Sequence, residues 1–358
     1  MISNLNNLCK FWKNKKVFLT GHTGFKGCWF SIILNLLGAK IVGYSLKPTQ
    51  KLNFFELANL ESILEKSIIG DIRDYKKLKE SINKFKPDFV VHMAAQSLVK
   101  ESYNYPKYTY EVNTLGTVNV LNILKELNYI NSALIITTDK VYENWNNKVY
   151  YKEDSNLGGA DPYSNSKSCA ELAVSSYINS FFKDKNISVA TARAGNVIGG
   201  GDFSLYRIIP DYFRSFKKKK LFLRSPNSIR PWQHVIDPLY GYLLLLRRLY
   251  YKKDNCNEHA WNFGPKKSNN KSVFHVINTI NSHFNNSITI IKKPNLIEKH
   301  YESKILMLNS EKSKRLLKWE AKYDLNKAVK IIVDWQKSFI RKENILKISQ
   351  QQILDHLS

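Results

Sequence analysis

The chain has 358 residues, of which 43% are hydrophobic, and it carries a formal net charge of +25. This length allows one large domain or two closely joined ones with a sizeable core. No stretch reaches the roughly 18 apolar residues of a membrane span, and residues 1–16 lack the apolar core of a signal peptide. We therefore expect a cytoplasmic protein with no membrane partner.

The positive charge raises the alternative of nucleic-acid binding, because basic patches attract phosphate backbones. The lysines are scattered, however, and Lys217 to Lys220 form the only tight cluster in the sequence. No zinc-finger, bZIP or RRM pattern accompanies this cluster, so we expect no nucleic-acid partner. The excess charge would instead help to attract an anionic substrate.

The cysteines indicate neither a disulfide framework nor a metal site. They are far apart and form no C-x-x-C pair, which favours a reducing compartment. His275 and His283 are eight residues apart without acidic partners, so we do not expect them to bind metal. The four cysteines are Cys9, Cys28, Cys169 and Cys256.

The first half of the chain repeats a short apolar run followed by a longer amphipathic stretch. Alternating strands and helices indicate a parallel sheet covered on both faces. Right-handed crossovers then give a doubly wound, Rossmann-type fold. The expected strands are 17–20, 40–46, 67–72, 88–93, 134–138 and 187–192, and the expected helices are 29–37, 75–85, 113–127 and 164–182.

The pattern changes near residue 195, where Gly199-Gly200-Gly201 and several prolines punctuate shorter segments. We therefore expect a dinucleotide-binding domain over residues 1–195. Residues 196–358 are expected to form a smaller, mainly substrate-binding region, with some segments returning to the main sheet.

A glycine-rich loop follows the first expected strand and opens the first helix. Gly21 suits the tight turn, Gly24 lets backbone approach a pyrophosphate, and Gly27 lets the helix lie close to the strand. The N–H groups at the helix end would bind the diphosphate of a dinucleotide. The predicted contacts in this loop are Gly21, Thr23, Gly24, Phe25, Lys26 and Gly27.

The second strand lacks the carboxylate that normally binds the adenine ribose. It ends in Gly43-Tyr44-Ser45-Leu46-Lys47. Ser45 can hydrogen-bond a ribose hydroxyl, whereas Lys47 suits a 2′-phosphate. NAD is the preferred cofactor, and NADP is the alternative.

Two further motifs carry candidate catalytic groups. Tyr163 and Lys167 are four residues apart, on one face of an expected helix, so the ammonium would lower the pKa of the phenol. Thr138, Asp139 and Lys140 follow a strand whose C-terminal end faces the ligand crevice. A plain polar strand end and a chance Tyr-x-x-x-Lys spacing are the structural alternatives.

These motifs, with His92-Met93-Ala94-Ala95-Gln96 and Asn113, resemble the extended short-chain dehydrogenase/reductase family. The strings GHTGFKG (21–27), LGGADPYS (157–164), GNVIGGGD (195–202) and RPWQHV (230–235) resemble the branch of CDP-glucose 4,6-dehydratases, over most of the chain. The resemblance implies a nucleotide-sugar substrate and a homodimer formed through residues 113–127 and 164–182. It implies further cofactor contacts at Asp71, Ile72, Ala94, Ala95, Gln96 and Asn113, and substrate contacts at Gln96, Asn196, Arg230 and Tyr301.

The resemblance also implies a redox-neutral cycle. Tyr163 would take the proton of the sugar 4-hydroxyl while hydride leaves C4, and Thr138 would hydrogen-bond the same oxygen. Asp139, kept protonated, would act as the acid for the leaving 6-hydroxyl. Lys140 replaces the glutamate of dTDP-glucose enzymes; it would either remove the C5 proton or stabilise the enolate. Hydride then returns to C6.

Two other classes remain open at this stage. One is another nucleotide-sugar enzyme of the same fold, such as a 4-epimerase or a decarboxylase. An epimerase needs no acid/base pair after Thr138, so Asp139 and Lys140 argue against an epimerase. A non-catalytic dinucleotide-binding protein would commonly lack Tyr163 or Lys167, and both are present.

Overall fold

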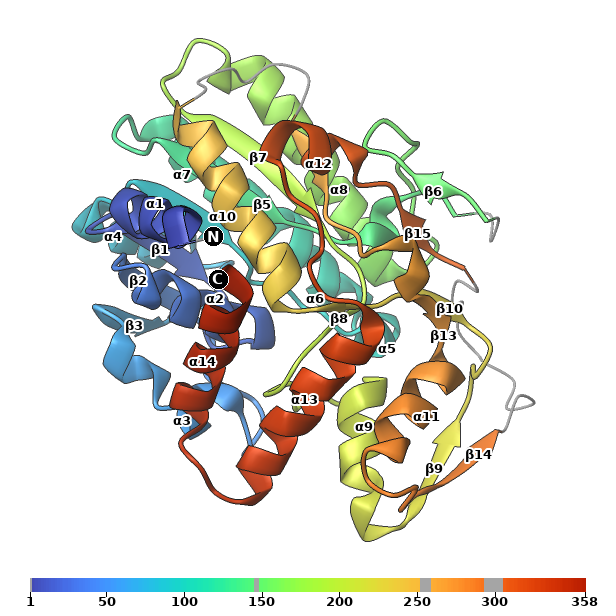
Figure 1. Ribbon diagram of the computed structural model, residues 1–358. Coiled ribbons are helices and arrows are strands. Elements are labelled where there is room, and N and C mark those ends of the chain that lie inside the picture. Colours follow the sequence, from blue (N-terminus) through green and yellow to red (C-terminus); the bar gives the residue numbers. More distant parts are fainter. Residues whose placement is uncertain (1, 145–147, 252–258, 293–304) are drawn as a thin grey trace.

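The computed structural model describes residues 2–144, 148–251, 259–292 and 305–358. A seven-stranded sheet lies at its centre, in the order β12-β7-β5-β4-β1-β2-β3 (Figure 1). Every neighbouring pair in it is parallel, which confirms the predicted doubly wound sheet. The strands are β1 (Lys16–Thr20), β2 (Lys40–Ser45), β3 (Lys66–Ile69), β4 (Phe89–His92), β5 (Ser132–Ile136), β7 (Ser188–Arg193) and β12 (Ala260–Asn262).

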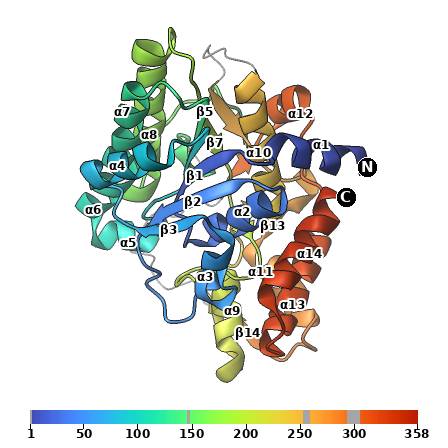
Figure 2. The ribbon, with the colours of Figure 1, turned by 90° about the vertical axis from the view of Figure 1, so that its left-hand side faces the viewer.

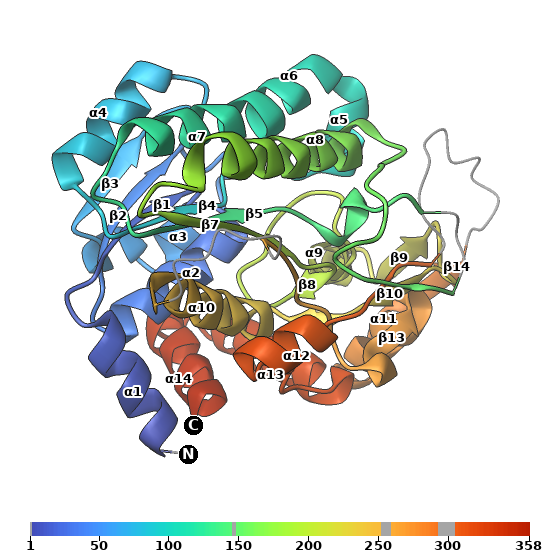
Figure 3. The same cartoon turned by 90° about the horizontal axis from the view of Figure 1, so that it is seen from above.

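Helices cover both faces of this sheet (Figure 3). One face carries α4 (Tyr75–Phe85), α7 (Gly116–Glu126) and α8 (Pro162–Tyr177), and the other carries α2 (Phe25–Leu36) and α10 (Ile236–Tyr251). Successive strand side chains point to opposite faces. In β1, Phe18 therefore packs with the first set of helices, while Val17 and Leu19 pack with the second.

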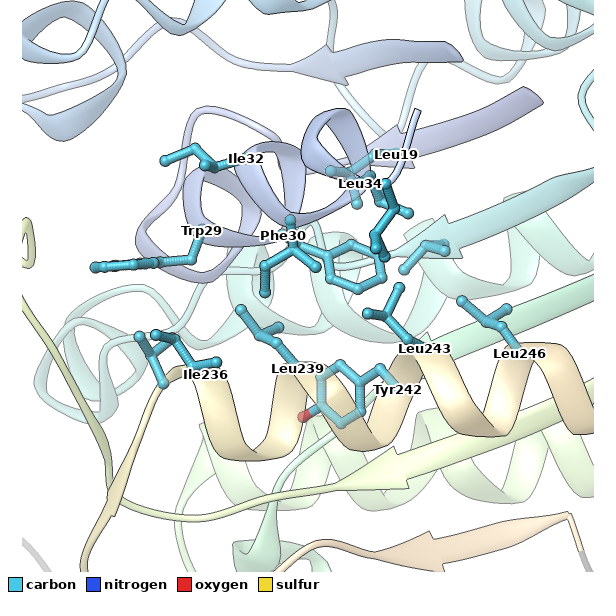
Figure 4. Close-up of a cluster of buried hydrophobic side chains, with 14 of the residues drawn as sticks. Leu19, Trp29, Phe30, Ile32, Leu34, Ile236, Leu239, Tyr242, Leu243 and Leu246 are labelled. Carbon is cyan, nitrogen blue, oxygen red and sulfur yellow. The ribbon is translucent and has the colours of Figure 1, made fainter. Parts of the chain in front are cut away.

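The contact between α2 and α10 joins the first half of the chain to the second. Trp29, Phe30 and Leu34 on α2 face Leu239 and Leu243 on α10, all fully buried (Figure 4). Each such side chain contributes about 1.5–3 kcal/mol through burial. The later chain thus supplies both a helix and the edge strand β12 to the main layers.

Several of the remaining segments form a smaller lobe of two-stranded sheets and helices beside the strand ends (Figure 2). Its core contains side chains of the helices α9 (Ile208–Arg214), α11 (Val273–Ser282) and α13 (Leu325–Ile340). The paired strands are β8 (Val197–Ile198) with β11 (Gln233–His234), β9 (Lys220–Leu223) with β14 (Thr289–Lys292), β10 (Ile229–Pro231) with β13 (Asn270–Ser272), and β6 (Tyr150–Tyr151) with β15 (Met307–Leu308). The other helices are α1 (Ile2–Trp12), α3 (Phe54–Leu57), α5 (Val99–Asn104), α6 (Pro106–Tyr110), α9 (Ile208–Arg214), α11 (Val273–Ser282), α12 (Glu311–Leu317), α13 (Leu325–Ile340) and α14 (Ile345–Leu357).

Two predicted helices are less regular than expected. The helix expected over 113–127 is α7 preceded by a π-helical turn at Glu111–Leu115, and the one expected over 164–182 ends in a π-helical turn at Ile178–Phe182. Among the described residues, no helix is long and apolar enough to cross a membrane.

Candidate active site

The glycine loop between β1 and α2 forms one wall of a cavity of about 360 Å³. Gly21 has a φ of +79°, and a Cβ at Gly27 would lie 2.1 Å from the Gly21 carbonyl oxygen, so neither position accepts a side chain without strain. Gly24 is the N-cap of α2 and has no side chain to occupy the helix end. The positive end of α2 therefore faces the cavity, as a bound diphosphate requires.

Most of the predicted cofactor contacts meet around this cavity. Ser45 lines it and shares a 2.9 Å hydrogen bond with Thr23, while Lys47 also lines it. The predicted residues in its wall are Gly21, Thr23, Gly24, Phe25, Lys26, Gly27, Ser45, Asp71, Ile72, Ala94, Ala95, Tyr163 and Lys167.

Gln96 and Asn113 are not among the residues that line this cavity or the neighbouring one. Asn113 is fully buried, accepts a bond of 2.8 Å from the Gln96 N–H and donates to the Gln96 carbonyl and to Ser166. The Gln96 side chain bonds to Leu98 and Thr109. Both residues therefore hold the chain after β4 in place.

A second cavity, of about 500 Å³, adjoins the first. Thr138, Asp139, Lys140, Asn196 and Arg230 line it, as the sequence predicts for the catalytic and substrate-binding groups. The two cavities share Phe25, Lys26, Ser97, Tyr163, Asp202 and Arg207. Tyr163 thus lies where a cofactor and a substrate would meet.

Local capping fixes Tyr163 at this junction. Asp161 accepts a 2.9 Å hydrogen bond from the Ser164 N–H, and Pro162 occupies the first position of α8. The Thr138 hydroxyl lies close enough to the Tyr163 phenol to act on its pKa. The first turn of α8 therefore places the phenol next to the end of β5.

The predicted lowering of the Tyr163 pKa is wrong for the protein without ligands. Burial raises the pKa of Tyr163 to about 12, although the Thr138 hydroxyl and the Arg207 charge act in the opposite direction. Lys167 Nζ donates 3.0 Å to the Ile136 carbonyl. Burial and the charge of Lys26 lower the pKa of Lys167 to about 8. Tyr163 and Lys167 lie on one helix at the expected spacing, but the pKa of Tyr163 is raised rather than lowered.

Asp139 lies at the floor of the second cavity and is 2% exposed. Thr138 Oγ1 donates to Asp139 Oδ1 over 3.1 Å, whereas Oδ2 has no hydrogen-bond partner among the described residues. Burial raises the pKa of Asp139, and the Lys140 charge opposes this only in part. The carboxyl is therefore biased toward its protonated form, which suits a general acid.

Two groups of polar residues in and around the site escaped sequence reasoning. Arg207 pairs with Asp202 at 3.1 Å and donates to Ser97, at the boundary of the two cavities. Glu171 on α8 pairs with Arg193 on β7 at 2.9 Å, fully inside the protein. Asp202 ends one of the recognised strings, but nothing in the sequence marks Arg207, Glu171 or Arg193 as partners.

Two other predictions concern the substrate contact at Tyr301 and metal binding. Tyr301 lies outside the described residues. Within the described ranges, no group of three or more His, Cys, Asp or Glu side chains is arranged to hold a metal ion.

A nucleotide-sugar enzyme of the dehydratase class is what this fold and site define, and comparison with known proteins agrees. The chain belongs to the GDP-mannose 4,6 dehydratase family, whose model matches residues 18–332. It is 42% identical over 355 residues to CDP-glucose 4,6-dehydratase of Salmonella typhimurium, covering 97% of this chain and 98% of that protein. The resemblance inferred from the motifs is thereby confirmed.

More distant matches share the fold. UDP-glucose 4-epimerase 4 of Oryza sativa is 24% identical, covering 90% of each chain. The structure of dTDP-glucose 4,6-dehydratase from Bacillus anthracis, in complex with NAD, superposes with a TM-score of 0.75 at 21% identity and covers 93% of this chain and 99% of that one. An epimerase from Methanothermobacter thermautotrophicus gives a TM-score of 0.78 at 20% identity, covering 95% and 98%.

Proposed function

We propose that this protein is an NAD-dependent 4,6-dehydratase that converts CDP-glucose to CDP-4-keto-6-deoxyglucose and water. The observation that carries the proposal is the position of Tyr163 where the two cavities meet, above the Thr138-Asp139-Lys140 triplet. The 42% identity to the CDP-glucose enzyme supports the choice of substrate. A bound nicotinamide would supply reversible hydride transfer, from C4 of the sugar and back to C6.

Tyr163 is the proposed base for the sugar 4-hydroxyl. The Thr138 hydroxyl acts on the Tyr163 phenol at close range, so both groups can hold one substrate oxygen. The raised pKa of Tyr163 keeps the phenol protonated in the unliganded protein. Positive charge brought into the adjoining cavity by a ligand would favour its ionised form.

Asp139 is the proposed acid for the 6-hydroxyl that leaves as water. The 4-ketone acidifies the C5 hydrogen, and loss of that proton with the protonated hydroxyl gives the 5,6-alkene. Lys140 lines the same cavity, where it either removes the C5 proton or stabilises the enolate.

Exchange of the C5 hydrogen reports on formation of the enolate, the step in which Lys140 would act in either role. We expect Lys140→Met to retain oxidation at C4 but to lose dehydration. If Lys140 is the base, exchange of the C5 hydrogen with deuterated solvent is also lost, as mass spectrometry of the sugar would show. Full turnover of this variant would remove Lys140 from the mechanism.

The cation-rich wall of the second cavity is the proposed diphosphate site. Arg230 and Asn196 lie in that wall, and a guanidinium suits bidentate contact with phosphate oxygens. Gln96 and Tyr301 stay candidate substrate contacts on the family resemblance. For the cofactor, we propose NAD because Ser45 offers a ribose contact; Lys47 keeps NADP as the alternative to test.

We further propose a cytoplasmic homodimer that supplies a deoxysugar precursor for a surface polysaccharide. Apolar side chains are exposed on the two predicted dimer helices and their π-helical turns: Leu115 is 56% exposed, Leu172 58% and Phe181 43%. Among the described residues, Cys9, Cys28 and Cys169 are free thiols, which fits a reducing compartment.

Product mass from separate nucleotide sugars tests the proposal. The purified protein is incubated with NAD or NADP and with CDP-, dTDP-, GDP- or UDP-hexoses. We expect loss of one water from CDP-glucose, with NAD, without net accumulation of NADH. Dehydration of another nucleotide sugar would change the substrate but keep the mechanism. An isomer of unchanged mass would identify an epimerase, and no reaction despite cofactor binding would contradict the proposal.

A further inference from the structure

Gly195 lies directly against the carboxyl of Asp139. A Cβ at this position would stand 1.7 Å from Asp139 Oδ2 and 2.2 Å from its Cγ, and the three nearest atoms all belong to Asp139. Gly195 is not among the glycines with positive φ, so its backbone conformation suits alanine as well. A side chain at Gly195 would therefore need the space that the Asp139 carboxyl fills.

Gln233 prevents the Gly195 backbone from moving away. Its fully buried side-chain amide donates to the Gly195 carbonyl over 3.2 Å and to the Phe263 carbonyl over 2.7 Å. Its own N–H donates to the Asn196 carbonyl over 3.3 Å. These bonds hold the loop after β7 against the end of β12, so the Gly195 backbone stays next to the Asp139 carboxyl.

The charged groups that act on Asp139 come from several elements. Lys140 and Arg230 line the substrate cavity, Lys26 lines both cavities, and all three favour the carboxylate. Tyr163 from α8 and Tyr242 from α10 also interact with it electrostatically. If the Asp139 carboxyl were displaced from the niche above Gly195 toward the cavity, it would lie closer to these three cations and in less apolar surroundings.

We infer that Gly195, held by Gln233, is a positioning residue that seats the Asp139 carboxyl in a niche where it keeps its proton for the leaving hydroxyl. The inference rests on the proposed function for the role of the acid, but the steric relation does not. Glycine is needed at this position for the chemistry of its neighbour rather than for a turn.

The pH profile of Gly195→Ala tests the seating of the acid. A general acid must be protonated, so activity falls as pH rises through its pKa. Displacement toward the cations lowers that pKa, and we expect the high-pH limb of dehydration to move to lower pH by about one unit, the usual spread for carboxyls in proteins. At neutral pH dehydration should fall at least about tenfold, within the range for general acids. An unmoved limb would contradict the inference.

A double-mutant cycle in thermal unfolding tests the steric relation without substrate. Gly195→Ala should lower Tm in the wild-type background, but not in Asp139→Ala, where the new methyl occupies vacated space. Gly264→Ala is the matched control: its Cβ would lie 2.7 Å from Leu308, away from Asp139, so its effect should persist in both backgrounds. Should Gly195→Ala alone fail to fold, recovery of folding in the double variant gives the same result.

The outcomes of the two experiments are distinguishable. Equal loss of Tm from Gly195→Ala in both backgrounds would overturn the niche. Wild-type protein that dehydrates no nucleotide sugar would overturn the proposed function, and with it the acid role, while the unfolding cycle would still decide whether Gly195 seats the carboxyl.

Discussion

Asp139 and Glu171 are both almost completely buried, with 2% and 1% of their surfaces exposed, yet burial has opposite consequences for them. Glu171 accepts bonds from Thr137 and Thr191 and pairs with two nitrogens of Arg193. Asp139 accepts one bond of 3.1 Å, from Thr138. Burial alone would raise the pKa of Glu171, but Arg193 and the hydroxyls hold it below its usual range, whereas the pKa of Asp139 is raised.

The difference shows that a paired counter-charge and hydrogen-bond donors, rather than depth, decide the charge of a buried carboxyl. The Glu171 cluster joins α8, β7 and the residue after β5, so it fixes Thr138 relative to Tyr163. Asp139, one residue beyond Thr138, lines a cavity, and its Oδ2 has no hydrogen-bond partner in the described part of the chain. Glu171 thus stabilises the structure around the site, whereas Asp139 is positioned for proton transfer.

The largest effect should come from removing the acid. We expect Asp139→Asn to slow dehydration about 10²- to 10⁴-fold, the usual contribution of a general acid, while oxidation at C4 persists. Stability at neutral pH should not fall, because the neutral amide avoids the cost of a buried charge. Rapid-quench mass analysis, with NADH absorbance, measures both steps. Unchanged dehydration would assign the proton to another group.

A change in the Glu171 cluster should instead lower the free energy of unfolding. Glu171→Gln leaves Arg193 buried without a counter-charge, which typically costs about 3–5 kcal/mol of unfolding free energy. Glu320→Gln, which breaks the exposed Lys314–Glu320 pair at 3.7 Å, should cost less than about 1 kcal/mol.

Equilibrium urea unfolding measures both variants. Because Glu171→Gln with Arg193→Met removes both charges, the double variant should recover part of the loss. If Glu171→Gln lowered the free energy of unfolding no more than Glu320→Gln does, the Glu171 cluster would not stabilise the structure around the site.

This contrast also marks what the sequence predicts. The periodic runs predict the parallel sheet, and strand ends place Thr138, Asp139 and the glycine loop at one crevice. The pairing of Glu171 with Arg193 is invisible in sequence, because each lies in a different element, 22 residues from the other. The rise in the Tyr163 pKa was missed because helical spacing reports the neighbouring charge but not the burial that outweighs it.

The smallest effect concerns pH, where the two carboxyls should act on stability in opposite directions. The folded-state pKa of Asp139 is raised above 3.8, so the folded chain holds this proton more tightly than the unfolded chain does. Stability therefore declines as pH rises from 3.8 to the raised folded-state pKa. The folded-state pKa of Glu171 is lowered, so its contribution is present above 4.5 and is lost as pH falls through the folded value.

Comparing wild type with Asp139→Asn over a series of pH values isolates the first dependence. The variant should gain on wild type as pH rises from about 4 toward neutrality, by about 1.4 kcal/mol for each unit by which the Asp139 pKa is raised. Glu171→Gln should instead fall farther behind wild type as pH rises from the lowered folded-state pKa of Glu171 to 4.5, because only the wild type gains the paired carboxylate. A difference between wild type and Asp139→Asn that stays constant with pH would mean that Asp139 titrates alike in the folded and unfolded chains. The two buried carboxyls would then differ in their partners but not in their charge.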